Sequence, residues 1–163
     1  MSIEDDIALL ETVPMLNMLG RDALRAIAIS ADNRPLNRGE ILFREGQFAE
    51  AAFVVASGTL SVAREDANLA RRPGQTIQVG RGALLGEMAL LTETKRPATA
   101  MAVEPSTVLR IPRVIFMRTI EGYPDVAVRL TQALTNRVQD TLAELDAVRR
   151  RLDALEPAPR RPR

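Results

Sequence analysis

The chain has 163 residues, of which 46% are hydrophobic and 26% charged, a length and composition that fit one domain with a single core and an appendage. Its 22 basic and 21 acidic residues leave a net charge of +1, so no overall field favours nucleic acid or a membrane surface. The chain contains neither cysteine nor histidine, which excludes disulfides, Ser-His and Cys-His nucleophilic pairs, and metal sites built on thiolate or imidazole ligands.

Residues 1–34 are predicted to form a helical segment. Apolar residues recur there at intervals of three and four in two runs, Ile3, Ile7 and Leu10, then Leu24, Ile27 and Ala28. Pro14 separates the two runs, and the second helix is expected to start near Gly20. The segment shows neither a signal peptide nor a long apolar run, so we expect a cytoplasmic protein with no membrane span in this chain.

Residues 35–112 are predicted to form a β-barrel. Short apolar runs alternate there with regularly placed glycines, namely Gly39, Gly46, Gly58, Gly74, Gly80, Gly82 and Gly86. Such spacing is typical of an antiparallel barrel or sandwich. An exposed loop is expected over 66–75, with its turn at 72–75, and a last strand over 103–111 with a bend at Pro105.

Residues 113–156 are predicted to form a hinge and a long helix. A first helix covers 113–122, a break follows at Gly122, Tyr123 and Pro124, and Asp125 is a candidate N-cap. Apolar residues then recur every three or four positions, at Val126, Leu130, Leu134, Val138, Leu142, Leu145, Val148, Leu152 and Leu155. A helix of about 31 residues would span roughly 46 Å. One small barrel cannot cover that length, so we expect a homodimer through this helix. Residues 157–163 are predicted to be a disordered basic tail.

The stretch from Gly86 to Ala100 carries the chemistry. Gly86 would let backbone approach a ligand closely, and the N–H groups opening a short turn over 87–91 would attract an anion. Arg96 would pair with phosphate oxygens, whereas Glu87 would accept a hydrogen bond from a sugar hydroxyl. These groups predict a pocket for a ribose joined to a phosphate. The alternative is that Glu87 and Arg96 form a solvated surface ion pair.

The motif Gly86-Glu87, the apolar turn and Arg96-x-Ala98-Thr99 closely resemble the phosphate-binding cassette of cyclic nucleotide-binding domains. Residues 39–46 and 53–60 are similar to that family's early strands. The resemblance implies an α+β fold, an antiparallel β jelly-roll barrel flanked by an N-terminal helical segment and a long C-terminal helix. It also implies that the helical parts move when a ligand binds.

The resemblance assigns a role to each residue of the cassette. Glu87 would accept from the ribose 2′-hydroxyl, Arg96 would pair with the cyclic phosphate, and the backbone of Gly86 and Ala89 would line the same site. The apolar wall would comprise Leu85, Met88 and Ala98. Thr99 would lie near the base edge. Arg137, on the long helix, would either stack on the purine or be an ordinary surface charge.

One residue departs from the family pattern. Pro97 follows the phosphate arginine and has no N–H to donate, so the affinity is expected to be modest. The chain also lacks the serine or threonine that some guanine-selective members carry there. Both points favour cyclic AMP over cyclic GMP as the ligand, with no cofactor or metal.

The leading hypothesis is a non-enzymatic sensor in which binding repositions the C-terminal helix. A second reading is the sensor half of a catabolite activator-type transcription regulator. Because only eight residues follow Leu155, we expect no helix-turn-helix and no sequence-specific DNA binding in this chain. A third reading is the regulatory domain of a channel, transporter or kinase. A barrel enzyme ranks last, for want of histidine.

Overall fold

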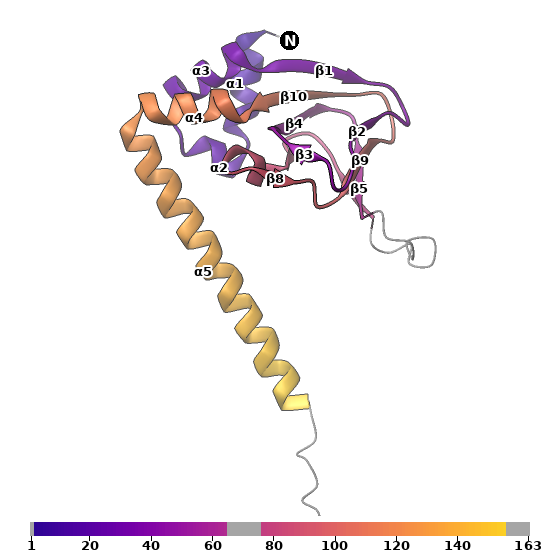
Figure 1. Ribbon diagram of the computed structural model, residues 1–163, viewed down its shortest axis with the longest axis vertical. Helices are drawn as coiled ribbons and strands as arrows, with labels where there is room; N and C mark the ends of the chain where they lie inside the picture. The colour runs from indigo at the N-terminus through magenta and orange to yellow at the C-terminus, as the bar shows by residue number, and fades with distance from the viewer. Residues whose placement is uncertain (1, 65–75, 156–163) are drawn as a thin grey trace, which may run out of the picture.

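The computed structural model describes residues 2–64 and 76–155, and within the last helix the side chains at 133, 134, 136–141 and 155 are not described. A β-barrel lies beside a group of short helices, and a long helix projects away from both (Figure 1). The predicted α+β fold with an antiparallel barrel and flanking helices is confirmed. The predicted loop over 66–75 and the tail over 157–163 lie outside the described residues.

The N-terminal segment contains the helices α1 (Ile3–Glu11), α2 (Pro14–Asn17) and α3 (Arg21–Ser30). Ser2 caps α1 through a capping box, in which its hydroxyl accepts from the Asp5 N–H while the Asp5 carboxylate accepts from the Ser2 N–H. Pro14 ends the first periodic run as predicted, but it also opens α2, since proline suits the first turn of a helix. Helix α3 starts directly after Gly20, as the sequence predicted. Gly20 itself has a φ of 87°.

The described strands form two four-stranded antiparallel sheets and a two-stranded ribbon. In spatial order, the first sheet contains β1 (Asp32–Leu36), β10 (Ser106–Pro112), β4 (Ala51–Ser57) and β7 (Leu84–Leu85). The second contains β2 (Ile41–Phe43), β9 (Thr99–Ala102), β5 (Leu60–Ala63) and β6 (Ile77–Val79). The ribbon pairs β3 (Phe48–Ala49) with β8 (Thr94–Lys95).

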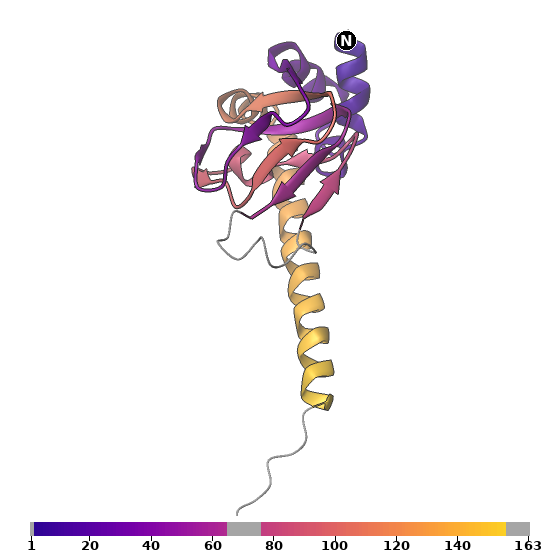
Figure 2. The same ribbon diagram turned by 90° about the vertical axis from the view of Figure 1, so that its right-hand side faces the viewer.

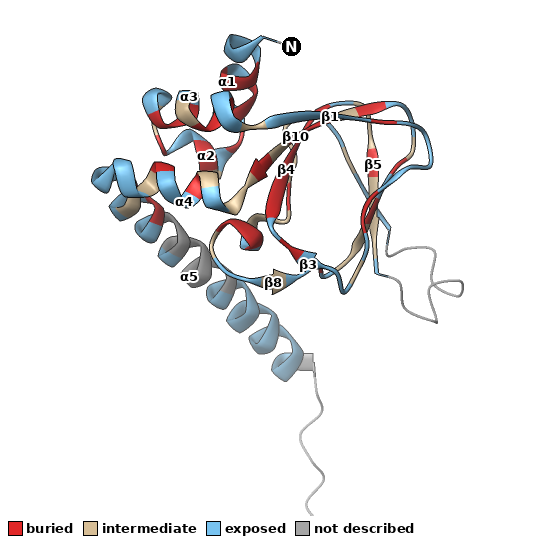
Figure 3. Ribbon diagram, turned by 45° about the horizontal axis from the view of Figure 1, so that its top comes forward, coloured by how far each residue is buried: buried red, intermediate tan, exposed pale blue. Residues whose placement is uncertain are grey.

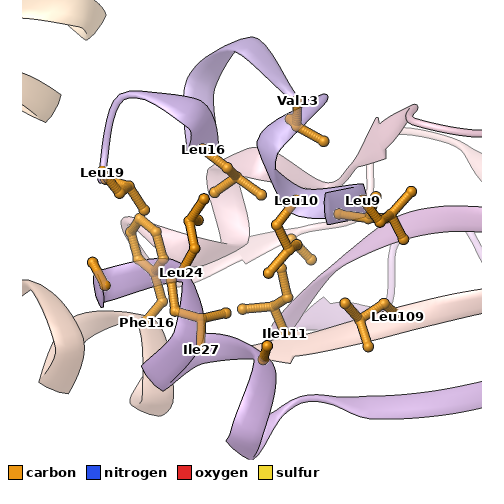
Figure 4. Close-up of a cluster of buried hydrophobic side chains, with 14 of the residues drawn as sticks. Leu9, Leu10, Val13, Leu16, Leu19, Leu24, Ile27, Leu109, Ile111 and Phe116 are labelled. Atoms are coloured by element: carbon orange, nitrogen blue, oxygen red, sulfur yellow. The ribbon is translucent and has the colours of Figure 1, made fainter. Parts of the chain in front are cut away.

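Strand β4 separates two hydrophobic cores, and six of its seven residues are buried (Figure 3). The helical core packs α1 to α3 against one face of the strand and includes Leu10, Leu24 and Phe116 (Figure 4). The barrel core fills the space between the two sheets and includes Phe43 and Phe53. Because side chains alternate along a strand, β4 serves both cores at once.

Two boundaries predicted from the sequence do not coincide with the ends of strands. Strand β1 begins at Asp32, so the predicted boundary between residues 34 and 35 falls inside it. The last strand begins at Ser106 and not at Val103, because the intervening residues form the connection from β9 to β10. The Ser106 hydroxyl closes this connection by accepting from the Thr59 N–H at 3.1 Å and donating to the Glu104 carbonyl at 2.8 Å.

The helix predicted over 113–122 is confirmed as α4 (Arg113–Gly122), and the long helix is α5 (Pro124–Leu155). Helix α5 starts one residue before the predicted N-cap, so Asp125 lies in its first turn. Val126 and Leu130, near the start of α5, are buried against the rest of the molecule. The later part of α5 projects away from the barrel (Figure 2). Within the described part of the chain, no helix is long and apolar enough to span a bilayer.

Candidate functional site

A pocket of about 400 Å³ opens beside the cassette. It lies where β7, β8 and the short 3-10 helix η3 (Glu87–Leu90) meet. Of the site residues predicted from sequence, those lining it are Leu85, Gly86, Glu87, Met88, Ala89, Arg96 and Pro97. The described residues contain no group of three or more acidic, cysteine or histidine side chains that could hold a metal ion.

Gly86 is required by Arg96. Its backbone is left-handed, with φ at 73° and ψ at 36°, and it precedes η3. A Cβ at this position would collide with Nη1 of Arg96 and would also lie 3.7 Å from the Ala51 carbonyl oxygen. The sequence predicted that glycine was needed for close approach of a ligand to the backbone. The structure shows that it also makes room for the cassette's own arginine.

Arg96 is a buried cation and not the surface ion pair that the sequence left open, since only 5% of the residue is exposed. Its Nη2 donates to the Ala51 carbonyl at 2.7 Å. Its Nη1 is buried and has no hydrogen-bond partner among the described residues. Burial lowers the pKa of Arg96, and the positive charge of Arg110 lowers it further. An anion bound next to Nη1 would therefore satisfy both an unused donor and an unbalanced charge.

The turn that follows Gly86 is formed as predicted, although its groups are used differently. The Ala89 N–H donates to the Gly86 carbonyl at 3.0 Å, so this amide closes the turn. Ala89 is fully buried, Glu87 is half-buried, and Met88 is 54% exposed at the pocket. Glu87 and Met88 thus keep exposed surface at the pocket, whereas Ala89 does not.

Ala98 and Thr99 are not among the residues that line the pocket. The Thr99 hydroxyl accepts the Glu45 N–H at 2.9 Å and so ties β9 to the turn after β2. The role near a base edge that the resemblance implied for Thr99 stays a prediction. The side chain of Arg137 lies outside the description, so its stacking role stays a prediction.

Sequence reasoning missed Arg113, the first residue of α4. Its Nη1 donates to the carbonyls of Ala49 at 3.0 Å, Ala89 at 3.3 Å and Thr92 at 3.1 Å, while its backbone N–H donates to Glu50 at 2.8 Å. One side chain therefore fastens the cassette to the helix that leads into α5. No local pattern marks such an arginine, because its acceptors are backbone groups from distant parts of the chain.

The fold and the pocket define a class, a small β-barrel with a helical cover and, among the described residues, a buried arginine beside its pocket. The chain belongs to the cyclic nucleotide-binding domain family, whose sequence model matches residues 33–123. This confirms the family expected from the cassette motif.

Three relatives illustrate the range of the family. The structure of a cyclic nucleotide-binding-like protein from Brucella abortus is 40% identical, with a TM-score of 0.62, and the match covers 72% of this chain and 98% of that one. The cyclic AMP receptor protein of Thermus thermophilus is 34% identical over 67% of this chain and 50% of its own length. A lysophospholipase of Chaetomium globosum is 26% identical over 64% of this chain. The present chain spans only 7% of that enzyme, and half of the receptor protein.

Proposed function

We propose that this chain is a non-enzymatic sensor that binds a 3′,5′-cyclic mononucleotide in the pocket beside Arg96. The observation that carries the proposal is the buried Nη1 of this arginine, which has no hydrogen-bond partner among the described residues and lies where a Cβ on Gly86 would collide with it. A cyclic phosphate is a monoanion whose oxygens could accept from Nη1 without displacing the bond from Nη2 to Ala51.

The remaining lining residues suit the sugar and the base. Glu87 would accept from a ribose hydroxyl, while Leu85 and Met88 supply apolar surface. Pro97 lines the pocket without offering an N–H, so we propose a modest affinity and a preference for cyclic AMP over cyclic GMP. The proposal for Arg137 rests on the family resemblance.

We further propose that ligand binding repositions α5 through α4. Helix α4 packs against η3, and Arg113 donates to the carbonyl of Ala89 within η3 and to that of Thr92 just after it, so a shift of the cassette would be transmitted to α4. Binding can shift α5 only by as much as the ligand's affinity differs between the two helix positions.

The exposed face of α5 supports a homodimer. Leu145, Val148 and Leu152 are each more than half exposed and are spaced by three and four, as in the seam of a coiled coil. Burying each would contribute about 1.5–3 kcal/mol. We propose that a second copy of this helix covers the face.

The charges beside this seam favour parallel helices. Glu144 and Arg149 flank the seam five residues apart. In a parallel pair, Glu144 of one helix would therefore lie opposite Arg149 of the other, so that opposite charges meet. In an antiparallel pair centred on this segment, Arg149 would instead meet its own copy. The parallel arrangement places both barrels at the same end.

A second candidate function is the sensor half of a transcription regulator. It is favoured by the 34% identity to the Thermus thermophilus cyclic AMP receptor protein, of which this chain spans half. Both candidates require the same pocket and differ in what α5 controls.

Calorimetric titration with cyclic AMP, cyclic GMP and cyclic di-GMP tests the binding. We expect saturable binding of the mononucleotides, tighter for cyclic AMP, and no heat from the dinucleotide. The nucleotide recovered after incubation should be intact. Hydrolysis by pure protein, or no binding at millimolar ligand, would refute the sensor.

A further inference from the structure

The Arg96 guanidinium lies against two aromatic rings of the barrel core. Its central carbon is 4.3 Å from the ring centroid of Phe43 and 5.4 Å from that of Phe53. The two rings are stacked on each other, with centroids 5.9 Å apart and planes 29° from parallel. Both phenylalanines are more than nine-tenths buried.

Every other described contact of Arg96 also restrains it. Its backbone N–H donates to the Gln47 carbonyl at 2.8 Å, and its carbonyl accepts from the Gly46 N–H at 2.9 Å. Its Nη2 is bound to the Ala51 carbonyl. Arg96 is thus held at its backbone, at the face of its guanidinium and at Nη2, whereas Nη1, beside Gly86, has no hydrogen-bond partner in the described part of the chain.

An aromatic face stabilises a buried cation in a different way from a carboxylate. The negative potential of a ring face attracts the guanidinium but uses none of its N–H donors. A carboxylate would bind those same donors, and a phosphate would have to displace it. A ring therefore allows the arginine to be buried and oriented while its charge stays available to an anion.

We propose that Phe43 is a positioning residue that holds the Arg96 guanidinium in its binding orientation before any ligand arrives. Phe53 contributes the same effect more weakly, because its ring is farther away. Neither ring lines the pocket, so Phe43 acts on the ligand only through Arg96. The inference rests on the proposed anion-binding function of this pocket.

The test compares Phe43→Leu with Phe116→Leu, a matched control. Phe116 is also a fully buried phenylalanine, but it belongs to the helical core. Both variants should melt earlier than the wild type. In calorimetry with cyclic AMP, Phe43→Leu should raise the Kd about two- to tenfold, since the freed arginine must be ordered on binding. Phe116→Leu should leave the Kd unchanged, and Phe53→Leu should raise it less than Phe43→Leu does. Phe43→Tyr, which keeps an aromatic ring, should have a Kd within about twofold of the wild-type value.

A double-mutant comparison separates positioning from a general loss of packing. Adding Phe43→Leu to Arg96→Ala should cost no further affinity, because the ring then has no guanidinium to hold. An equal loss in both backgrounds, or an unchanged Kd in Phe43→Leu, would overturn the proposal.

A ligand-free measurement keeps this inference distinct from the proposed function. In proton–nitrogen NMR spectra of the free protein, ring currents should displace the Arg96 side-chain resonances, and Phe43→Leu should remove that displacement. If the wild type bound neither cyclic nucleotide, the proposed function would fail while these spectra still decided whether Phe43 orients Arg96. Unchanged resonances in Phe43→Leu would refute the positioning role.

Discussion

Gly86 and Arg96 are fitted to each other, because a Cβ on residue 86 would occupy the place of the arginine's Nη1. The backbone at Gly86 is also left-handed, which costs an ordinary residue about 1–2 kcal/mol. The two requirements are independent, so they can be separated by experiment.

Gly86→Ala should both destabilise the fold and abolish cyclic nucleotide binding, since it strains the backbone and displaces Arg96. Gly39→Ala is the matched control. Gly39 has φ at 82° but nothing within 4 Å of its Cβ position, so this variant should lose a similar 1–2 kcal/mol of stability and keep its affinity. Melting temperature and calorimetry on both variants measure this, and retained binding in Gly86→Ala would contradict the assignment.

Arg96→Met should separate binding from stability. Removing the phosphate's main counter-charge should cost about 2–5 kcal/mol of binding free energy, or roughly thirtyfold to several thousandfold in Kd. Burial lowers the pKa of Arg96, which means that its charge is disfavoured in the folded state. The apolar methionine keeps much of the packing without that charge, so the ligand-free protein should melt no earlier than the wild type. Arg96→Lys should recover only part of the affinity. An unchanged Kd in both variants would show that the phosphate binds elsewhere.

Asp6→Asn should stabilise the protein at neutral pH. Asp6 is 4% exposed, its Oδ1 has no hydrogen-bond partner among the described residues, and burial raises the pKa of its carboxyl. The folded state binds the carboxyl proton of Asp6 more tightly than the unfolded state does. The resulting stabilisation is therefore complete below the ordinary pKa of about 3.9, and it is lost as the pH rises through the raised pKa of the folded state. The variant should therefore melt roughly 1–4 °C above the wild type at pH 7, with a smaller difference at pH 4. A gain of equal size at both pH values would exclude titration of Asp6 as the cause.

Arg113→Met should loosen the cassette. The change removes the donor to Ala49, Ala89 and Thr92, so cyclic nucleotide affinity should fall and amide exchange over 89–92 should accelerate. Arg118→Met, at an exposed position of the same helix, should change neither. Equal exchange rates in the two variants would mean that Arg113 does not restrain the turn.

The parallel dimer can be tested with single cysteines, because the chain has none of its own. Val148→Cys should form an interchain disulfide under mild oxidation, whereas Arg150→Cys, on the outer face of the proposed pair, should not. Glu144→Arg should weaken the dimer in sedimentation experiments, and adding Arg149→Glu should restore it. A wild-type monomer at high micromolar concentration would refute the pairing.

The sequence predicted well those features that depend on local patterns. The apolar periodicity of α5, the break before it and the Gly86 turn each lie within a short window, and each occurs where it was expected. The features it missed join distant segments. Arg96 meets Phe43 and Ala51 only after the barrel closes, and Arg113 meets its acceptors only after α4 packs on the cassette.

The hydroxyl of Thr99 illustrates a different limit. The resemblance placed Thr99 near the base edge, yet in the structure its hydroxyl accepts a hydrogen bond from the backbone N–H of Glu45. Competition between a ligand and the protein's own amides for one acceptor depends on distances in the closed barrel, and no residue spacing encodes them.

The two buried faces of β4 determine how its alignment with its neighbours is specified. In most strands, a slip of one residue is prevented because it would bury polar side chains. Both faces of this strand are apolar, so polarity cannot distinguish the alternatives. Side-chain size distinguishes the correct alignment instead, because the small Ala52 and Ala56 belong to the helical core while the large Phe53 belongs to the barrel core. A slipped strand would force a phenyl ring into closely packed helices and leave a void behind Arg96, so the volumes of adjacent residues in one strand fix the shape of both cores.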